Sequence, residues 1–261
     1  MLVSLYQNDP EFGATEENLD EILEMTEDES FDLLVLPELF ASGYLFESKG
    51  EARELGSKAG KGKVFDALTD LASERDAMIV FGFPEVDGDK IFNSAAALYP
   101  DGNFRIYRKT HLFSTEKEIF DPGDTGFFVF DFRGTRVGII ICFDWIYPES
   151  VRALALRGAQ IVCHPSNLVL PHCPAAMITR ALENRVFTVT ADRIGEENRA
   201  GNNLRFIGQS RIVAPDGKVL GELGDDRPGL ITAEIEPEVS DNKRITPMNN
   251  LLEDRRPEFY A

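Results

Sequence analysis

Short runs of apolar residues recur along this chain and alternate with segments of helical periodicity. The runs are "DLLVLPE" (32–38), "AMIVFGFPE" (77–85), "RVGIIIC" (136–142) and "AQIVCHP" (159–165). A strand that is apolar throughout has both faces covered, which is typical of a largely parallel sheet with helices outside it. We expect these helices at residues 16–30, capped by Thr15, after Gly62, and within "PESVRALALRG" and "AAMITRALENR". The alternation predicts an α/β fold.

The same hairpin pattern occurs once in each half of the sequence. Residues 93–109 and 208–224 each lead an apolar run into Pro-Asp-Gly and out again. Proline sets φ, aspartate bonds the backbone ahead of it, and glycine accepts a positive φ. The repeat favours two similar sheets related by a pseudo-twofold. Because no linker or charge block divides the chain, we predict a single domain over residues 1–261.

Composition excludes several classes of function. The 261 residues are 43% hydrophobic, yet no apolar run is long enough to span a membrane. The N-terminus shows no basic, apolar leader, so we expect a cytoplasmic protein. The net charge of −18 and the lack of a basic stripe argue against nucleic-acid binding. An acidic surface also fits a salty cytoplasm, an idea to abandon if stability is the same in dilute buffer and molar KCl.

Cys142 ends the run "GIIIC" and precedes Phe143 and a helix-start signal at residues 148–150. We therefore expect Cys142 at the last position of a buried strand, at the edge where open α/β sheets bind ligands. The following turn would aim the Phe143 N–H at a developing oxyanion. A cysteine here is either a small buried hydrophobe or a nucleophile, and a nucleophile needs a base or a cation nearby.

Two further candidates also stand at the ends of apolar runs. Glu38 is the last residue of the run at 32–38, where burial would raise the pKa of its carboxyl and suit it to general-base chemistry. Lys109 closes "IYRK", and beside carboxylates it would stay protonated as a fixed positive charge. The ordinary alternative for both is exposure to solvent. Ends of strands in a parallel-type sheet can converge, which favours one shared site.

The histidines and the other cysteines offer two competing sites. His111, His164 and His172 keep a papain-like Cys–His site open, although no orienting carboxylate pattern accompanies them. "CHPSNLVLPHC" also offers Cys163, His164, His172 and Cys173 as metal ligands. Adjacent strand residues face opposite ways, and the spacing matches no usual zinc site. We therefore predict no metal site from these residues, and bystander roles for Cys163 and Cys173.

Three motifs together carry a family resemblance. They are "LLVLPELF" with Glu38, "YRKTHLF" with Lys109 and "GIIICFDWIYPE" with Cys142, in that order. With these motifs the chain resembles the nitrilase, or carbon–nitrogen hydrolase, superfamily over essentially its whole length, from "VSLYQ" to "EDRRPEFY". The resemblance implies a four-layer αββα sandwich whose subunits dimerise through outer helices, hence a homodimer or a larger homo-oligomer.

The resemblance also assigns roles to residues. It implies a catalytic triad of Glu38, Lys109 and Cys142, with Glu116 rather than Glu118 as a fourth polar residue. Cys142 would attack the substrate carbon, Glu38 would move protons, and Lys109 would stabilise the oxyanion. This mechanism would need no metal and no organic cofactor. Positions after the strand ends suggest four substrate-binding residues: Tyr44, Phe143, Trp145 and Asn167.

Several functions remain open at this stage. The leading one is hydrolysis of non-peptide C–N bonds in small linear amides, with release of ammonia. The alternatives are hydrolysis of small aliphatic nitriles, hydrolysis of N-carbamoyl amines or amino acids, and non-catalytic binding on the same fold. The expected partner is a small amide or nitrile, with no nucleic acid and no membrane.

Overall fold

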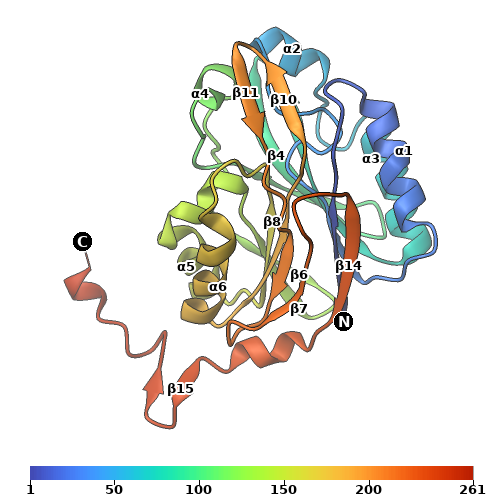
Figure 1. Ribbon diagram of the computed structural model, residues 1–261. Helices are drawn as coiled ribbons and strands as arrows, with labels where there is room; N and C mark the ends of the chain where they lie inside the picture. Colours follow the sequence, from blue (N-terminus) through green and yellow to red (C-terminus); the bar gives the residue numbers. More distant parts are fainter. Residues whose placement is uncertain (261) are drawn as a thin grey trace.

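Two six-stranded sheets lie face to face with helices on their outer surfaces (Figure 1). The structure is a computed structural model and describes residues 1–260. The first sheet has the order β14 (Gly229–Glu234), β1 (Leu2–Gln7), β2 (Leu33–Val35), β3 (Met78–Asp87), β4 (Lys90–Leu98), β5 (Phe104–Arg108). The second has the order β13 (Val219–Glu222), β12 (Arg211–Val213), β9 (Phe187–Ala191), β8 (Ile161–Pro165), β7 (Thr135–Ile139), β6 (Val129–Phe132).

The two sheets repeat one arrangement. In each, three neighbouring strands are parallel: β1, β2 and β3 in the first sheet, and β7, β8 and β9 in the second. An antiparallel strand flanks this trio on one side, and an antiparallel hairpin continues it on the other. The hairpins are the two Pro-Asp-Gly segments, β4–β5 and β12–β13. The prediction of two similar sheets is confirmed.

The Pro-Asp-Gly turns have the expected local geometry. Gly102 and Gly217 have φ of +79° and +86°. The Asp101 carboxylate accepts the Asn103 N–H at 3.0 Å, and Asp216 accepts the N–H of the residue two positions on at the same distance. Each turn is therefore fixed by its own sequence.

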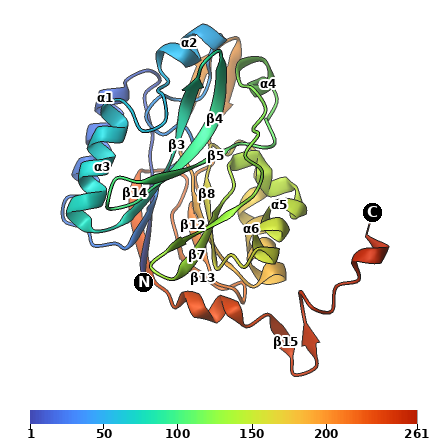
Figure 2. The same cartoon turned by 180° about the vertical axis from the view of Figure 1, so that it is seen from behind.

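Helices cover the outer faces of both sheets, which confirms the four-layer sandwich. On the first sheet lie α1 (Thr15–Thr26) and α3 (Lys63–Arg75), and on the second α5 (Pro148–Leu156) and α6 (Cys173–Asn184) (Figure 2). Alternating strand residues such as Val3, Leu5 and Ile139 fill the space between the sheets. The remaining elements are α2 (Lys49–Glu54), α4 (Glu116–Ile119), β10 (Glu196–Arg199), β11 (Asn202–Arg205), β15 (Arg244–Thr246), β16 (Asn249–Asn250), and the 3₁₀ turns η1 (Cys142–Ile146), η2 (Pro237–Asp241) and η3 (Pro257–Phe259).

Two local predictions are wrong. The first helix begins at Thr15 itself, with Ala14 as its N-cap and no side-chain cap, and it ends at Thr26. Thr15 therefore takes helical dihedrals and does not cap the helix. Cys142 is not the last residue of a strand either, because β7 ends at Ile139 and Cys142 opens η1. The groups that end this strand early belong to the site described below.

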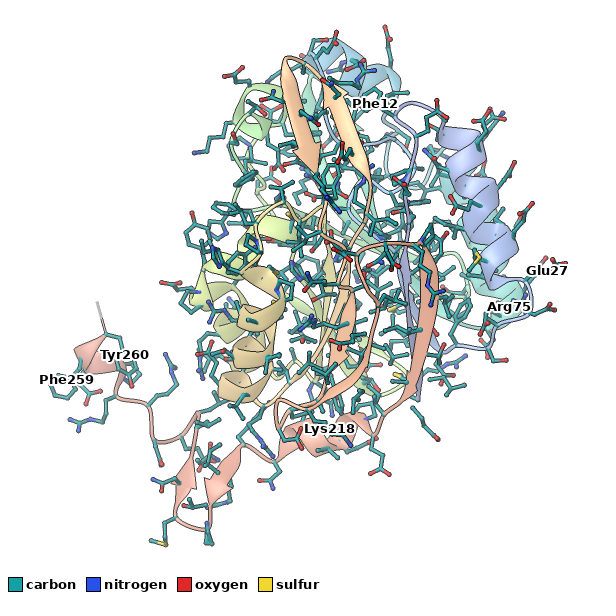
Figure 3. All side chains as sticks on the ribbon, viewed as in Figure 1. Phe12, Glu27, Arg75, Lys218, Phe259 and Tyr260 are labelled. Carbon is teal, nitrogen blue, oxygen red and sulfur yellow. The ribbon has the colours of Figure 1, made fainter. Side chains whose placement is uncertain are left out.

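The C-terminal residues form an arm that leaves the body of the molecule (Figures 1 and 3). Lys243 donates to the carbonyls of Asn184 and Arg185 at the base of this arm. Beyond it, the hydrogen bonds of residues 244–260 all go to partners within 242–260. Met248 and Phe259 on the arm are 85% and 71% exposed. Among residues 1–260, none of the helices combines the length and the apolar character that crossing a membrane requires.

Candidate active site

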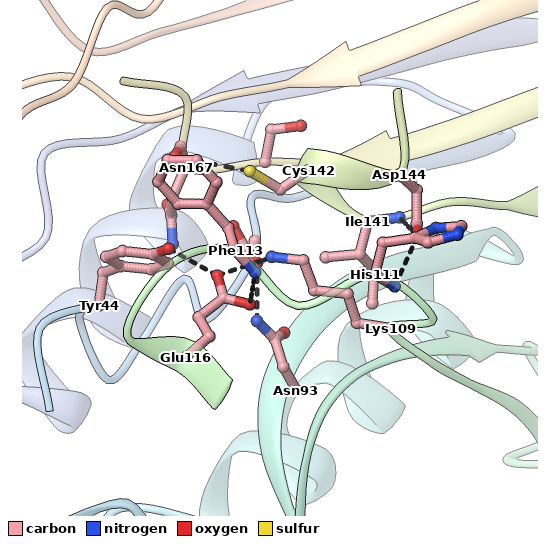
Figure 4. A network of polar contacts seen from close by, with 12 residues as sticks. Tyr44, Asn93, Lys109, His111, Phe113, Glu116, Ile141, Cys142, Asp144 and Asn167 are labelled. Atoms are coloured by element: carbon pink, nitrogen blue, oxygen red, sulfur yellow. Dashed lines mark hydrogen bonds and ion pairs between the residues drawn. The ribbon is translucent and has the colours of Figure 1, made fainter. Parts of the chain in front are cut away.

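Three of the charged residues named from the sequence meet in the interior. Glu38 follows β2, Lys109 follows β5, and Glu116 is the first residue of α4. The Lys109 ammonium donates to Glu38 Oε1 at 2.6 Å. It also donates to Glu116 Oε1 at 2.7 Å (Figure 4). All three side chains are almost completely buried. A lysine held between two carboxylates is a fixed positive charge in a setting of low dielectric constant.

Close backbone contacts fix where Glu38 stands. Gly82 on β3 lies against the turn after β2, and a Cβ at this position would sit 2.5 Å from Glu38 Cα. The Gly82 N–H donates to the Pro37 carbonyl at 3.1 Å, and the Gly82 carbonyl accepts the Phe40 N–H at 3.3 Å. A glycine is required here because only hydrogen fits between the two backbones.

Asn93 on β4 joins the carboxylate to the lysine. Its side-chain Nδ2 donates to Glu38 Oε1 at 2.7 Å, and its backbone carbonyl accepts the backbone N–H of Lys109 at 2.8 Å. The second Glu38 oxygen, Oε2, is buried and has no hydrogen-bond partner within residues 1–260. Glu38 therefore keeps one oxygen available to accept a proton.

Cys142 sits in a strained turn that long-range contacts hold. Its φ is +39°, which side-chain-bearing residues rarely adopt. The buried Asp144 carboxylate accepts the Ile141 N–H at 2.9 Å and the Tyr107 hydroxyl at 2.7 Å. It also accepts the His111 N–H at 3.1 Å and contacts His111 Nδ1 at 2.7 Å (Figure 4). These contacts draw residues 140–144 out of the β-ladder and leave Cys142 as the first residue of η1.

His164 supports the turn from behind. Its Nε2 lies 3.0 Å from the Cys142 carbonyl, which can only accept, so Nε2 carries the proton. Its Nδ1 then accepts from the Thr190 hydroxyl at 3.1 Å. Burial lowers the pKa of His164 to about 4, so the ring is neutral near pH 7. The Cys142 sulfur instead contacts the backbone carbonyl of Asn167, at 3.6 Å. This geometry does not support a papain-like Cys–His pair.

The electrostatics of the cluster favour a neutral thiol beside a charged lysine. Burial raises the pKa of the Cys142 thiol well above its usual value, the nearby Glu38 adds to this, and Lys109 opposes it. Burial raises the pKa of Glu38 too, against the pull of Lys109. Burial alone would lower the pKa of Lys109, but Glu116 and Glu38 outweigh it and the net shift is upward. The thiol thus needs a base to become a nucleophile.

The Cys142 side chain lines a small cavity of about 10 Å³, room for about one water. Three of the four predicted substrate-binding residues share this lining: Phe143, Trp145 and Asn167. Both polar atoms of the Asn167 amide are buried without a partner in the described chain. The Phe143 N–H lies in the first turn of η1, where N–H groups have no intrahelical acceptor. Tyr44 is placed differently, since its hydroxyl donates to Glu116 Oε1 at 2.5 Å.

Other residues named from the sequence do not line the Cys142 cavity. Glu118 is exposed on α4, whereas Glu116 is buried. Cys163 and Cys173 are fully buried, and burial raises the pKa of both thiols. Within residues 1–260, no group of three or more histidines, cysteines and acids is placed to hold a metal ion. A larger cavity of about 270 Å³ opens among α1, α2 and α3 and shares no residue with the Cys142 cavity.

Sequence reasoning missed four polar residues that hold the cluster: Asn93, Asp144, His164 as a backbone anchor, and Glu197, which accepts backbone N–H groups near Tyr44. Asn93 had one available signal, an amide at the head of the mostly apolar stretch "NSAAAL". A buried polar side chain on a central strand needs a polar partner. The other three act through contacts between residues far apart in the chain.

Comparison with known proteins gives one consistent result. The family model described as "Carbon-nitrogen hydrolase" matches residues 2–244. A nitrilase from Pyrococcus abyssi is 43% identical over 99% of this chain and 98% of its own length. An (R)-stereoselective amidase from a Pseudomonas species is 36% identical over 86% of this chain and 80% of its own.

One solved structure of similar fold is a mutant amidase from Nesterenkonia sp. AN1 that shows covalent addition of the acetamide moiety of fluoroacetamide at the active-site cysteine. Its TM-score is 0.81 at 28% identity, covering 99% of this chain and 94% of that one. The match of the family model, the two relatives and the shared fold all point the same way. The chain belongs to the carbon–nitrogen hydrolase family.

Proposed function

We propose that this protein hydrolyses small linear amides to the acid and ammonia through a thioester on Cys142. The observation that carries the proposal is the Lys109 ammonium bound between Glu38 and Glu116, close enough to Cys142 to affect its ionisation. A neutral thiol, a carboxylate with a free oxygen and a buried cation are the groups that acyl transfer from an amide requires.

The reaction runs in two halves. Glu38 takes the thiol proton while the sulfur attacks the amide carbon, and the negative oxygen of the tetrahedral intermediate is held by Lys109 and the Phe143 N–H. Glu38 then gives its proton to the departing nitrogen, which leaves as ammonia, and a thioester remains. In the second half Glu38 takes a proton from water, and the hydroxide displaces the thiolate. The acid is released and the thiol recovers its proton.

The lining of the Cys142 cavity indicates the acyl group. Its eight residues carry no charge and include three aromatic side chains. A carboxylate or an ammonium on the substrate would lose hydration there without gaining an ion pair. The small volume argues against a long or bulky acyl chain, and the Asn167 side-chain amide, which has no partner in the described chain, is available for the substrate carboxamide. These features favour short, uncharged aliphatic amides over N-carbamoyl amino acids.

A nitrile is the second candidate, because a relative that is 43% identical is named a nitrilase. The same sulfur would add to the nitrile carbon, and the negative charge would then develop on nitrogen. Ammonia release from a matched panel of short amides, nitriles and N-carbamoyl compounds separates these candidates. Higher kcat/KM for the nitriles than for the matched amides would replace the amidase proposal.

Replacement of the nucleophile is the direct test. Cys142→Ala is expected to remove ammonia release entirely, and wild-type enzyme quenched with a slow amide should gain the mass of the acyl group on the peptide that contains Cys142. Cys173→Ala is the matched control, since this buried thiol does not line the Cys142 cavity. Full turnover by Cys142→Ala would refute the mechanism, and a wild type inert to the whole panel and to iodoacetamide would favour a non-catalytic binding protein.

We also propose that the protein is a homodimer or larger homo-oligomer in which a second copy covers the C-terminal arm. The arm exposes Ile245, Met248, Phe259 and Tyr260. The neighbouring outer helices α5 and α6 expose Leu156 and Leu182. Apolar side chains on an arm with no packing of its own gain stability only by burial against a partner. A second copy offers the same arm and the same helices in return.

A further inference from the structure

A buried carboxylate on the outlying hairpin β10–β11 reaches inward toward the cluster. The hairpin pairs only with itself and belongs to neither main sheet (Figure 1). Glu197 on β10 accepts the Tyr44 N–H at 3.0 Å and the Leu45 N–H at 2.7 Å. Residues 36–48 contain no helix or strand, so regular secondary structure does not hold these two N–H groups. The carboxylate therefore serves as the anchor of this loop.

Arg193 fixes the Glu197 carboxylate and also supports the Tyr44 ring through Phe206. Its guanidinium is almost fully buried and pairs with Glu197, and its Nη2 donates to the Pro10 carbonyl at 3.2 Å. The same guanidinium stacks 4.0 Å from the centre of the Phe206 ring, which meets the Tyr44 ring edge-on at 5.8 Å. The backbone and the ring of Tyr44 are thus both held from the hairpin side.

Tyr44 passes this support on to the charged cluster. Its hydroxyl donates to Glu116 Oε1 at 2.5 Å, and the same oxygen accepts the Lys109 ammonium at 2.7 Å. Burial, together with the charge of Glu116, raises the pKa of the Tyr44 phenol, so it remains a donor across the working pH range. Tyr44 therefore fixes one of the two carboxylates that orient Lys109.

The loop has room to move if its anchor is lost. A cavity of about 120 Å³ lies between the loop, α4 and the tip of the hairpin, and both Tyr44 and Glu116 line it. Packing therefore does not force Tyr44 against Glu116 from this side. The bonds from the Tyr44 and Leu45 N–H groups to Glu197 therefore help to keep the Tyr44 hydroxyl within reach of Glu116.

We infer that Glu197 is a positioning residue for catalysis, which acts through the loop at Tyr44 to hold Glu116 and hence the Lys109 ammonium in place. The inference rests on the proposed function, because Lys109 is the group that meets the oxyanion. It assigns to the hairpin a task in the reaction that neither the fold nor the triad motifs indicate.

The test replaces Glu197 by glutamine, which keeps the shape but loses the charge and one acceptor. Glu197→Gln is expected to lower kcat about 10- to 100-fold, with KM changed less than threefold. The reason is that a displaced Lys109 ammonium stabilises the oxyanion less well but leaves substrate binding largely intact. Glu197→Asp, which restores the charge, should recover part of the lost kcat. Thermal unfolding curves verify that each variant is folded at the assay temperature.

A double mutant separates this role from general destabilisation. Tyr44→Phe removes the hydroxyl and is expected to lower kcat by a similar factor. If Glu197 acts through that hydroxyl, the double variant should be no slower than the slower single variant. Multiplication of the two effects would overturn the inference, as would wild-type kcat in Glu197→Gln. The matched control is Glu196→Gln, at the exposed carboxylate next to Glu197 on β10, which should leave kcat unchanged.

A second readout needs no turnover. Iodoacetamide is itself a small amide, and the rate at which it alkylates Cys142 should fall equally in Glu197→Gln, Tyr44→Phe and the double variant. Unchanged alkylation in Glu197→Gln would overturn the inference even if no substrate were known. Failure of the proposed function would be seen in a different result, namely a wild-type protein that releases no ammonia from any compound of the panel.

Discussion

At the scale of the residue, different groups set the position of Cys142 and the ionisation of its sulfur. Asp144 and His164 fix where Cys142 stands through its neighbours and its carbonyl. Glu38 raises the pKa of the Cys142 thiol and Lys109 lowers it. Because burial keeps the thiol neutral, the proposed mechanism makes reactivity depend on the protonation state of Glu38, and the pH dependence of the reaction should follow that group.

The pH profile of kcat/KM should therefore have an acid limb set by Glu38. Its pKa lies above its usual value of 4.5, so activity is expected to fall as the pH drops through a midpoint above 4.5. The bond from Asn93 lowers this pKa. Asn93→Ala should consequently move the acid limb to higher pH. Rates measured from pH 4 to 8 provide the check.

Glu118→Gln is the control for this measurement, since Glu118 is an exposed carboxylate on the same helix as Glu116. It should leave the acid limb where it is. A limb that stays fixed in Asn93→Ala, or that moves to lower pH, would show that another group controls the reaction.

The sequence indicated the triad but not the residues that support it. Glu38, Lys109 and Cys142 each follow an apolar run, so local patterns pointed to them. Glu197 lies in the polar stretch "GEENRAGNN", which reads as a surface loop. Its burial follows from the approach of residues 44 and 45, about 150 positions away, and no local pattern records that approach.

At the scale of the element, glycine positions decide how closely the segments of the site approach each other. The turn that carries Glu38 lies against β3 only because residue 82 has no side chain. Strand and helix identities were predictable because periodicity is local. The end of β7 was not, since Ile140 and Ile141 match a strand, whereas Asp144, Tyr107 and His111 pull this segment into a turn through contacts across the fold.

Gly82→Ala should separate the Glu38 turn from β3. The new Cβ would meet backbone atoms at 2.5–2.6 Å, which cannot be relieved by a side-chain rotation. We expect a loss of about 1–3 kcal/mol in the free energy of unfolding, as for other overpacked sites, together with lower kcat. Urea unfolding and ammonia release measure the two effects.

Gly50→Ala is the matched control, because Gly50 is an exposed position within α2. Alanine is favoured over glycine in a helix, so this variant should gain about 0.5–1 kcal/mol and keep its activity. If Gly82→Ala were as stable and as active as Gly50→Ala, the close approach of the two backbones would not matter for function.

At the scale of the whole molecule, the arm is the part that its own chain leaves uncovered. Met248→Lys and Phe259→Lys place charges on its apolar surface and should weaken self-association. Light scattering after size-exclusion chromatography should give a mass near that of the 29.2 kDa chain for these variants and at least twice that for the wild type. Met25→Lys, at an exposed apolar position on α1, should behave as the wild type. A wild-type protein of single-chain mass would contradict the proposed oligomer.

In the proposed mechanism, the repeated halves of the sandwich divide the chemistry between them. The acid–base group and the cation come from the first half, just after β2 and β5, and the sulfur comes from the second, just after β7. Neither half holds all three of these groups. The mechanism therefore depends on how the two halves are aligned, and a slip between them too small to disturb either sheet is expected to abolish activity.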